Sequence, residues 1–97
     1  MSLYLPNLFH RVWIGSEMPQ QFRQFGDDWL QMNPGWRMVT WDENIIPTLI
    51  NRRQCEAART YAETSDLIRF EMLVRHGGVY IDTDFQPLRP IERLLDG

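Results

Sequence analysis

With 97 residues, a formal net charge of −3 and 43% hydrophobic residues, the chain can form one small globular domain. This composition argues against a disordered chain, and the acidic balance excludes a general electrostatic attraction to nucleic acid or to anionic membranes. No apolar run reaches the roughly 18 residues that a membrane span needs, and the single Cys55 cannot form an internal disulfide. Any phosphate binding must therefore be local, through a metal ion, an arginine or a helix N-terminus.

The first third of the chain predicts a strand followed by a helix. Leu8 to Ile14 is rich in β-forming residues and ends at Gly15, which predicts the first strand. Pro19 predicts the start of a helix, where its missing N–H costs nothing, and Asn33-Pro34-Gly35 predicts its end. Apolar residues recur along this helix at a spacing of three to four, at Phe22, Phe25, Trp29 and Met32.

The middle of the chain predicts a second strand and more helix. Trp36 to Trp41 alternates in a strand-like manner, and Asp42 is placed to cap a short helix that Pro47 keeps short or irregular. The pattern from Gln54 to His76 is helical, either as one helix or as two that meet near Thr64.

The last part of the chain predicts a third strand, and the order of strands and helices then predicts the fold class. Gly77 predicts a left-handed end to the preceding helix, Val79 to Ile81 predicts the third strand, and a short helix is expected at Ile91 to Leu95. Strands that alternate with helices predict an α/β fold with a mostly parallel sheet and right-handed crossovers. The pattern looks like the first half of a nucleotide-binding domain.

Asp82 and Asp84 are the first candidates for chemistry. In an extended segment both carboxylates point the same way, with α-carbons roughly 6.5–7 Å apart. Two such carboxylates between apolar Ile81 and Phe85 repel one another unless a cation bridges them. The alternative is structural, since Asp-Thr-Asp also suits a solvated turn.

Asp66 and Arg69 form a second pair. A helical wheel puts them within the arc of Phe70 and Leu73, where charges are costly unless they are paired or used. The structural alternative is an internal salt bridge between residues three apart, and Ser65 is likewise a candidate helix cap.

Aromatic and imidazole side chains complete the candidates. Trp13 ends the first strand, where ligands of parallel α/β sheets bind, and can either stack on a base or pack in the core. His10 is expected to be a satisfied buried imidazole, and His76 to lie at the end of its helix. The remaining tryptophans are assigned to packing: Trp29, Trp36 and Trp41.

Together these motifs resemble the DXD-motif glycosyltransferases. That family includes fungal initiating mannosyltransferases, bacterial capsule and lipopolysaccharide sugar transferases, and large clostridial toxin glucosyltransferases. The resemblance is carried by four segments in order and spacing, namely Pro6 to Gly15, Asn33 to Asp42, Ala62 to Arg69 and Gly77 to Asp84. It implies a GT-A-type, Rossmann-like sheet, of which this chain looks like the N-terminal half.

The resemblance also implies a role for each matching position. Trp13 would stack on the nucleotide base, with backbone contacts from Val12, and Tyr80 would line the nucleotide pocket. Asp82 would contact ribose or sugar, and Asp84 would bind Mn²⁺ or Mg²⁺ directly. Two further residues would hold the donor sugar, and these are Asp66 and Arg69. The donor would be a UDP- or GDP-sugar, the acceptor a saccharide, lipid-linked saccharide or protein, and the reaction retaining.

The length departs from the family pattern, because family members carry further segments that build the acceptor site. Residues 1–3 are set aside as a leader, so the predicted donor-binding region covers residues 4–97. An open half-sheet predicts exposed apolar surface and self-association. A non-catalytic domain that binds sugar nucleotides or serves as an assembly partner is the alternative. The expected location is the cytoplasm, at the inner face of the membrane, although a secreted effector fits the same residues.

Overall fold

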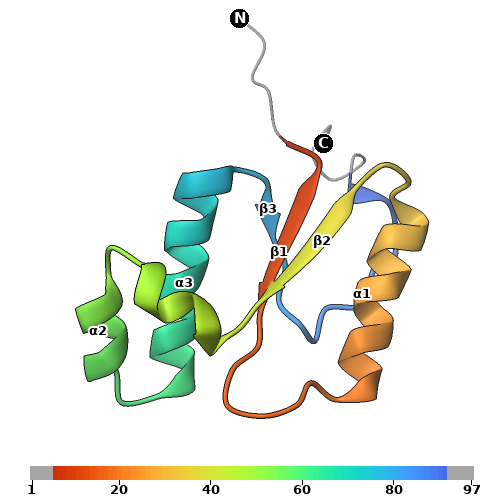
Figure 1. Ribbon diagram of the computed structural model, residues 1–97. Helices are drawn as coiled ribbons and strands as arrows, with labels where there is room; N and C mark the ends of the chain where they lie inside the picture. Colours follow the sequence, from red (N-terminus) through yellow and green to blue (C-terminus); the bar gives the residue numbers. More distant parts are fainter. Residues whose placement is uncertain (1–5, 92–97) are drawn as a thin grey trace, which may run out of the picture.

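Three parallel strands form one sheet in the order β2-β1-β3 (Figure 1). The computed structural model describes residues 6–91. The strands are β1 (Leu8–Val12), β2 (Arg37–Trp41) and β3 (Val79–Tyr80). All five residues of β1 are buried because this strand is paired on both edges and covered on both faces. The predicted α/β class and the three strands are confirmed, although β1 ends two residues and β3 one residue before the predicted ends.

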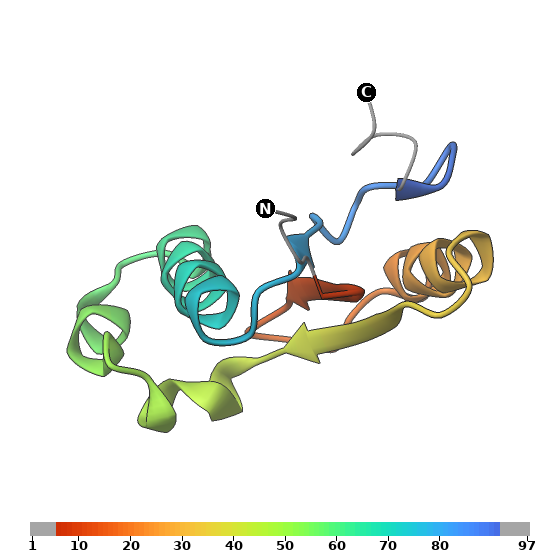
Figure 2. The same ribbon diagram turned by 90° about the horizontal axis from the view of Figure 1, so that it is seen from above.

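The helices cover both faces of this sheet. Figure 2 shows α1 (Gln20–Met32) on one side of the strands and α3 (Tyr61–His76) on the other. Between β2 and α3 the chain forms the 3-10 helix η1 (Glu43–Thr48) and the short helix α2 (Arg52–Ala57). As predicted, Asp42 caps η1, accepting a hydrogen bond of 2.9 Å from the Asn44 backbone N–H. This arrangement is consistent with part of a GT-A-like domain.

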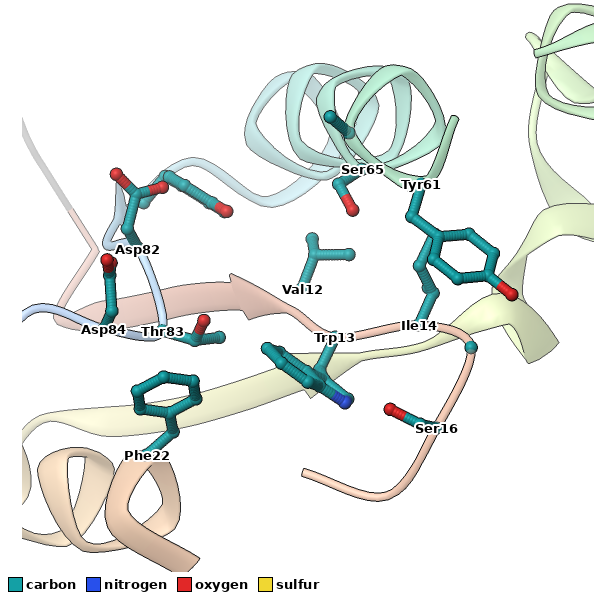
Figure 3. A pocket seen from close by; sticks show the side chains of 13 residues that line it. Val12, Trp13, Ile14, Ser16, Phe22, Tyr61, Ser65, Asp82, Thr83 and Asp84 are labelled. Carbon is teal, nitrogen blue, oxygen red and sulfur yellow. The ribbon is translucent and has the colours of Figure 1, made fainter. Parts of the chain in front are cut away.

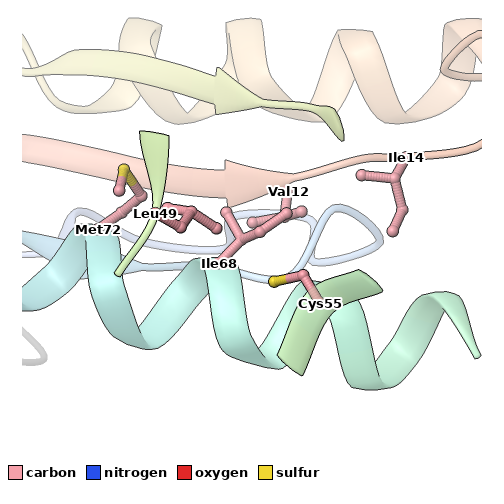
Figure 4. Packing of buried hydrophobic residues seen from close by; sticks show 6 residues of the cluster. All are labelled: Val12, Ile14, Leu49, Cys55, Ile68 and Met72. Carbon is pink, nitrogen blue, oxygen red and sulfur yellow. The ribbon is translucent and has the colours of Figure 1, made fainter. Parts of the chain in front are cut away.

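Alternating residues of β1 divide the core into two clusters. Phe9 faces α1, where its ring stacks on Trp36 with centroids 4.4 Å apart. Val12 faces α3 and belongs to the second cluster, drawn in Figure 4. That cluster consists of Val12, Ile14, Leu49, Cys55, Ile68 and Met72. The two clusters clamp β1 from both sides, and the position of its carboxyl end follows from that packing.

The helical region before β3 breaks earlier than predicted. The two helices are separated at residues 58–60, not near Thr64, and Thr60 is the cap of α3. The Thr60 hydroxyl accepts from the Glu63 N–H at 3.1 Å, and the Glu63 carboxylate accepts from the Arg59 N–H at 3.0 Å. Thr-x-x-Glu is a sequence signature of a helix start, so this helix boundary could have been predicted from the sequence. Ser65 therefore lies inside α3 and does not cap it.

The predicted buried arc of α3 is wrong. The buried residues are Thr64, Ile68, Glu71 and Met72, whereas Phe70 is 65% exposed and Asp66 is exposed as well. Glu71 lies on the buried side of α3 because backbone N–H groups donate hydrogen bonds to its carboxylate. Glu71 accepts hydrogen bonds from the N–H groups of Ile50 and Asn51 at 2.8 and 3.0 Å.

The two ends of the chain leave some predictions outside the structure. The leader at residues 1–3 and most of the final helix at residues 91–95 fall outside the described residues. Within residues 6–91, no helix combines the length and apolar character needed to cross a membrane.

His10 is a buried, satisfied imidazole, as predicted. Its side chain is fully buried, its Nε2 lies 2.6 Å from the Gly77 carbonyl oxygen, and its Nδ1 accepts from the Trp41 indole N–H at 3.0 Å. Burial lowers the pKa of His10 below its usual 6.5, and the neighbouring His76 lowers it further against the opposing effect of the Gly77 bond.

We therefore expect the fold to lose stability as the pH falls below 6.5. Below that value the unfolded chain binds a proton on this imidazole that the folded chain does not yet bind, so unfolding becomes more favourable. Above pH 6.5 the stabilisation is fully present. Urea unfolding between about pH 5 and neutral pH measures the slope, away from the ordinary carboxylate range. His10→Gln should flatten it, and an unchanged slope in that variant would assign the effect to another group.

Candidate functional site

A pocket of about 590 Å³ opens at the carboxyl ends of β1 and β3. Three parts of the chain line most of it: residues 12–16 after β1, the first turns of α3, and residues 80 and 82–84 around the end of β3. Figure 3 shows the two carboxylates at one end of this pocket and Tyr61 at the other. Since parallel strands place their carboxyl ends at one edge, this is where an α/β sheet binds ligands.

Asp82 and Asp84 both line this pocket, on a tight turn and not on an extended segment. β3 ends at Tyr80, and the Phe85 N–H donates to the Asp82 carbonyl at 3.1 Å, which closes the turn. The structural alternative for Asp-Thr-Asp is therefore correct for the backbone. It does not remove the functional one, because a turn also gathers two carboxylates at one place (Figure 3).

The core holds this turn on both sides. Before it, the Ile81 N–H donates to the His10 carbonyl at 2.9 Å, and the Ile81 side chain is buried. After it, the Trp29 indole N–H donates to the Phe85 carbonyl at 2.9 Å. Trp29 was assigned to packing alone, and its position in the core is confirmed. Its hydrogen bond also ties α1 to the aspartate turn.

Tyr80 lies beside the carboxylates and remains protonated at neutral pH. Burial, together with the negative charge and hydrogen bonding of Asp82, raises the pKa of Tyr80 to about 12. The Arg69 guanidinium lies over the Tyr80 ring, 5.0 Å from its centroid. The hydroxyl thus keeps its proton at the edge of the pocket, where it hydrogen-bonds to Asp82.

Asp66 and Arg69 make the internal salt bridge that was the structural alternative. Arg69 Nη2 lies 3.3 Å from Asp66 Oδ1, and the two side chains are 41% and 68% exposed. Such an exposed pair contributes only a few tenths of a kcal/mol. Arg69 reaches the site through Tyr80, whereas Asp66 lies with Gln54 and Leu67 along a separate hollow between α2 and α3.

Trp13 lies in the pocket wall, next to Val12, and its stacking on a nucleotide base stays a prediction. Its indole meets the Phe22 ring edge-on, with centroids 5.7 Å apart at 61°. The Phe22 carbonyl in turn accepts from the buried Arg11 at 2.9 Å, so α1 supports this wall. A rigid aromatic wall beside an open pocket can stack on a planar ring.

Sequence reasoning missed several lining residues, and Tyr61 is the most prominent. It is the first residue of α3, and its ring lies over Gly15, where φ is +89°. The positive φ favours a glycine here, because other residues rarely adopt that conformation, and an added β-carbon would also displace the exposed Tyr61 ring. The other missed positions are Ser16, Phe22, Ala62, Ser65 and Thr83. A correct start for α3 at Thr60 would have placed Tyr61, Ala62 and Ser65 near the strand ends.

The pocket has an acidic end. Among the described residues that line it, the side chains charged at neutral pH are Asp82 and Asp84. A diphosphate placed there would be repelled, unless a cation lay between it and the carboxylates.

The donor set fits a divalent cation of the Mg²⁺ or Mn²⁺ type. Within residues 6–91 no three His, Cys, Asp or Glu side chains form a ready metal cage. Mg²⁺ seldom needs one, because one or two carboxylates hold it while substrate phosphates and water complete the coordination. Asp82 and Asp84 would supply those carboxylates, and a phosphorylated ligand the remaining oxygens.

A family model described as a glycosyltransferase sugar-binding region containing a DXD motif matches residues 19–97. This chain belongs to that family. The matched region contains Tyr80 and both aspartates of the turn, and β1 lies outside it. The resemblance first seen in four short segments is thus confirmed at the level of the family.

Three relatives illustrate the range of this glycosyltransferase family. The chain is 29% identical to an uncharacterised glycosyltransferase of Acanthamoeba polyphaga mimivirus, over 82% of this chain and 36% of that protein. It is 25% identical to the subversion of eukaryotic traffic protein A of Legionella pneumophila, over 77% and 16%. It is 23% identical to inositol phosphoceramide mannosyltransferase 3 of Schizosaccharomyces pombe, over 97% and 28%.

This glycosyltransferase-family chain thus spans about a third or less of the length of these curated relatives. No solved structure matches it significantly.

Proposed function

We propose that this chain supplies the donor and metal site of a glycosyltransferase that uses a nucleotide-diphosphate sugar. The observation that carries the proposal is one pocket with an aromatic wall at Trp13 and two carboxylates on the Asp82–Phe85 turn. A flat wall suits a base, and paired carboxylates suit a cation on a diphosphate. Family membership supports transfer of a sugar as the reaction class.

Each residue has a proposed task in binding the donor. Trp13 stacks on the base, with Val12 beside it, and Tyr80 lines the nucleotide pocket, its protonated hydroxyl hydrogen-bonded to Asp82. Asp84 would bind Mn²⁺ or Mg²⁺ directly, and Asp82 would contact the ribose or sugar and share the metal. When bound, the metal ion would neutralise the charge that develops on the departing nucleoside diphosphate.

We assign Asp66 and Arg69 to the donor sugar with different structural support. Arg69 contacts the Tyr80 ring and lies near the aspartate turn, which places a positive charge beside the pocket. The Asp66 carboxylate is held by Arg69 and would reach a donor only if that exposed pair opened. A retaining reaction and a cytoplasmic location, at the inner face of the membrane, complete the proposal.

The test is calorimetric titration of the purified chain with UDP-glucose and GDP-mannose, each with and without Mn²⁺. A mannose donor is included because one relative is named a mannosyltransferase. Binding that requires Mn²⁺ and prefers one base would support the donor site and identify the nucleotide. A folded chain that binds neither donor with Mn²⁺ would contradict the proposal.

A non-catalytic role as a sugar-nucleotide binder or assembly partner is the second candidate. It is favoured by exposed apolar side chains at the end of the aspartate turn and just beyond it, where Phe85 is 54% and Leu88 86% exposed. Such a surface suits contact with another chain or self-association. Hydrolysis of a bound donor without added acceptor would distinguish an enzyme from a binder.

We expect Trp13→Ala to weaken donor binding by roughly tenfold to a hundredfold, since stacking a base on an aromatic ring contributes about 1–3 kcal/mol. Trp13→Phe should retain most of the affinity because it keeps a flat wall. Titration of both variants with the preferred donor and Mn²⁺ gives the comparison. Equal losses in the two variants would argue against stacking as the role of this side chain.

A further inference from the structure

We propose that His10 is a positioning residue for the donor site, because it ties the turn before β3 to the central strand and so sets the place of Asp82 and Asp84. The aspartates' role rests on the function proposed above, whereas the tie itself is a property of the fold. His10 lies in β1 and is fully buried.

The two hydrogen bonds of His10 determine its tautomer. An indole N–H can only donate, so the 3.0 Å bond from Trp41 requires Nδ1 of His10 to accept. The imidazole proton therefore resides on Nε2, which donates to the Gly77 carbonyl at 2.6 Å. One side chain thereby links β2, β1 and the C-terminal end of α3.

The Gly77-Gly78 turn is built to lie against this imidazole. Both glycines have positive φ, and a β-carbon at Gly78 would overlap the Leu8 carbonyl oxygen and lie 3.3 Å from His10 Nε2. His10 makes a further contact through its backbone, because the His10 carbonyl accepts from the Ile81 N–H at 2.9 Å. His10 thus anchors the chain at Gly77 and again at Ile81, next to Asp82.

Packing alone does not require a histidine at this position. The His10 ring stacks on Trp41 and His76, each with centroids 6.2 Å apart, and a phenyl ring would fill the same space. Burying an imidazole costs desolvation that only its hydrogen bonds offset. A phenylalanine at this position could not donate to the Gly77 carbonyl. Without that hydrogen bond, the chain that leads from Gly77 to the aspartate turn would lose its attachment to β1.

The experiment compares His10→Phe, His10→Gln and the control His76→Phe. Phenylalanine keeps the stacked ring and loses both hydrogen bonds, whereas the glutamine amide can still donate to Gly77. Amide NMR spectra of the ligand-free proteins report the position of residues 82–85, and calorimetry reports Mn²⁺-dependent donor affinity. We expect His10→Phe to shift those amide signals and to weaken binding about tenfold, the size expected for one lost hydrogen bond. His10→Gln should restore both, and His76→Phe should change neither.

Unchanged amide signals at residues 82–85 in a folded His10→Phe would overturn the inference, and so would equal effects of the phenylalanine and glutamine variants. If the unmutated chain bound no donor, the proposed function would fail. The amide signals would still show whether the His10 side chain positions the aspartate turn. If His10→Phe did not fold, His10→Met would take its place, since methionine is a flexible apolar side chain that also has no hydrogen to donate to the Gly77 carbonyl. Shifted signals at residues 82–85 in that variant would support the tie, and unshifted ones would overturn it.

Discussion

Asp84→Asn is expected to weaken Mn²⁺-dependent donor binding by at least about a hundredfold. Loss of a residue that only supports a metal ligand already costs roughly tenfold to a hundredfold in affinity, so loss of a direct ligand costs at least as much. Asparagine has the shape of aspartate but no charge. Of the two charged side chains that line the pocket in the described structure, only Asp82 would then remain. Calorimetric titration with donor at fixed Mn²⁺ measures the loss.

The same variant should not destabilise the metal-free fold. Two carboxylates on one turn repel each other, so removing one charge is expected to leave the free energy of unfolding unchanged or slightly higher. Asp28→Asn is the matched control, because it removes the same charge from α1, where the side chain accepts a bond from Gln24 at 3.0 Å. An Asp84→Asn protein that unfolds more easily and binds donor normally would assign this residue to structure and not to the site.

Glu71→Ala is expected to destabilise the fold by about 2–4 kcal/mol, because leaving a buried hydrogen-bond donor without a partner costs roughly 1–3 kcal/mol and Glu71 satisfies two of them. The Glu71 side chain is 5% exposed, pairs with Arg75 Nη2 at 2.8 Å, and accepts the Ile50 and Asn51 N–H groups. Its loss leaves those two donors without their acceptor in a partly buried place. Because small domains have only about 5–15 kcal/mol in total, urea unfolding should show a large fall in the midpoint.

Glu56→Ala provides the matched control for this prediction. Glu56 makes an exposed i, i+4 pair with Arg52 at 3.9 Å, so its removal should cost less than about 0.5 kcal/mol. Glu71→Gln should fall between the two, since it keeps an acceptor oxygen for the backbone and loses the charge. Similar midpoints for the Glu71 and Glu56 alanine variants would show that Glu71 is not a structural centre of the fold.

Local signals were sufficient for the strands and their order along the chain. β-forming runs bounded by glycine, proline and asparagine marked all three strands, and the cap at Asp42 was readable because its side chain bonds within two residues. Aspartates directly after a strand marked the site for the same reason. The ends of parallel strands meet at one edge whatever the rest of the fold does.

The helix before β3 shows where such signals were misread. The start of α3 was placed near Thr64 although Thr60 and Glu63 carry a capping box. The helical wheel placed Phe70 on the buried arc, because hydrophobicity was the only guide. In the structure Phe70 is exposed and Glu71 is buried, since the backbone N–H groups of residues 50 and 51 satisfy its carboxylate.

By itself the sequence determined the α/β class, the family and the pair of aspartates beyond the third strand. These depend on composition, on the glycines and prolines that end helices and strands, and on the spacing of motifs along the chain. The tertiary structure alone decided that Asp66 lines a hollow between α2 and α3, that Tyr61 lines the pocket, and that the His10 carbonyl and the Trp29 indole bond to the chain at the two ends of the aspartate turn. These depend on contacts between residues far apart in the chain, up to 71 positions for His10 and Ile81. Sequence periodicity carries no information on such pairings, and only packing brings them together.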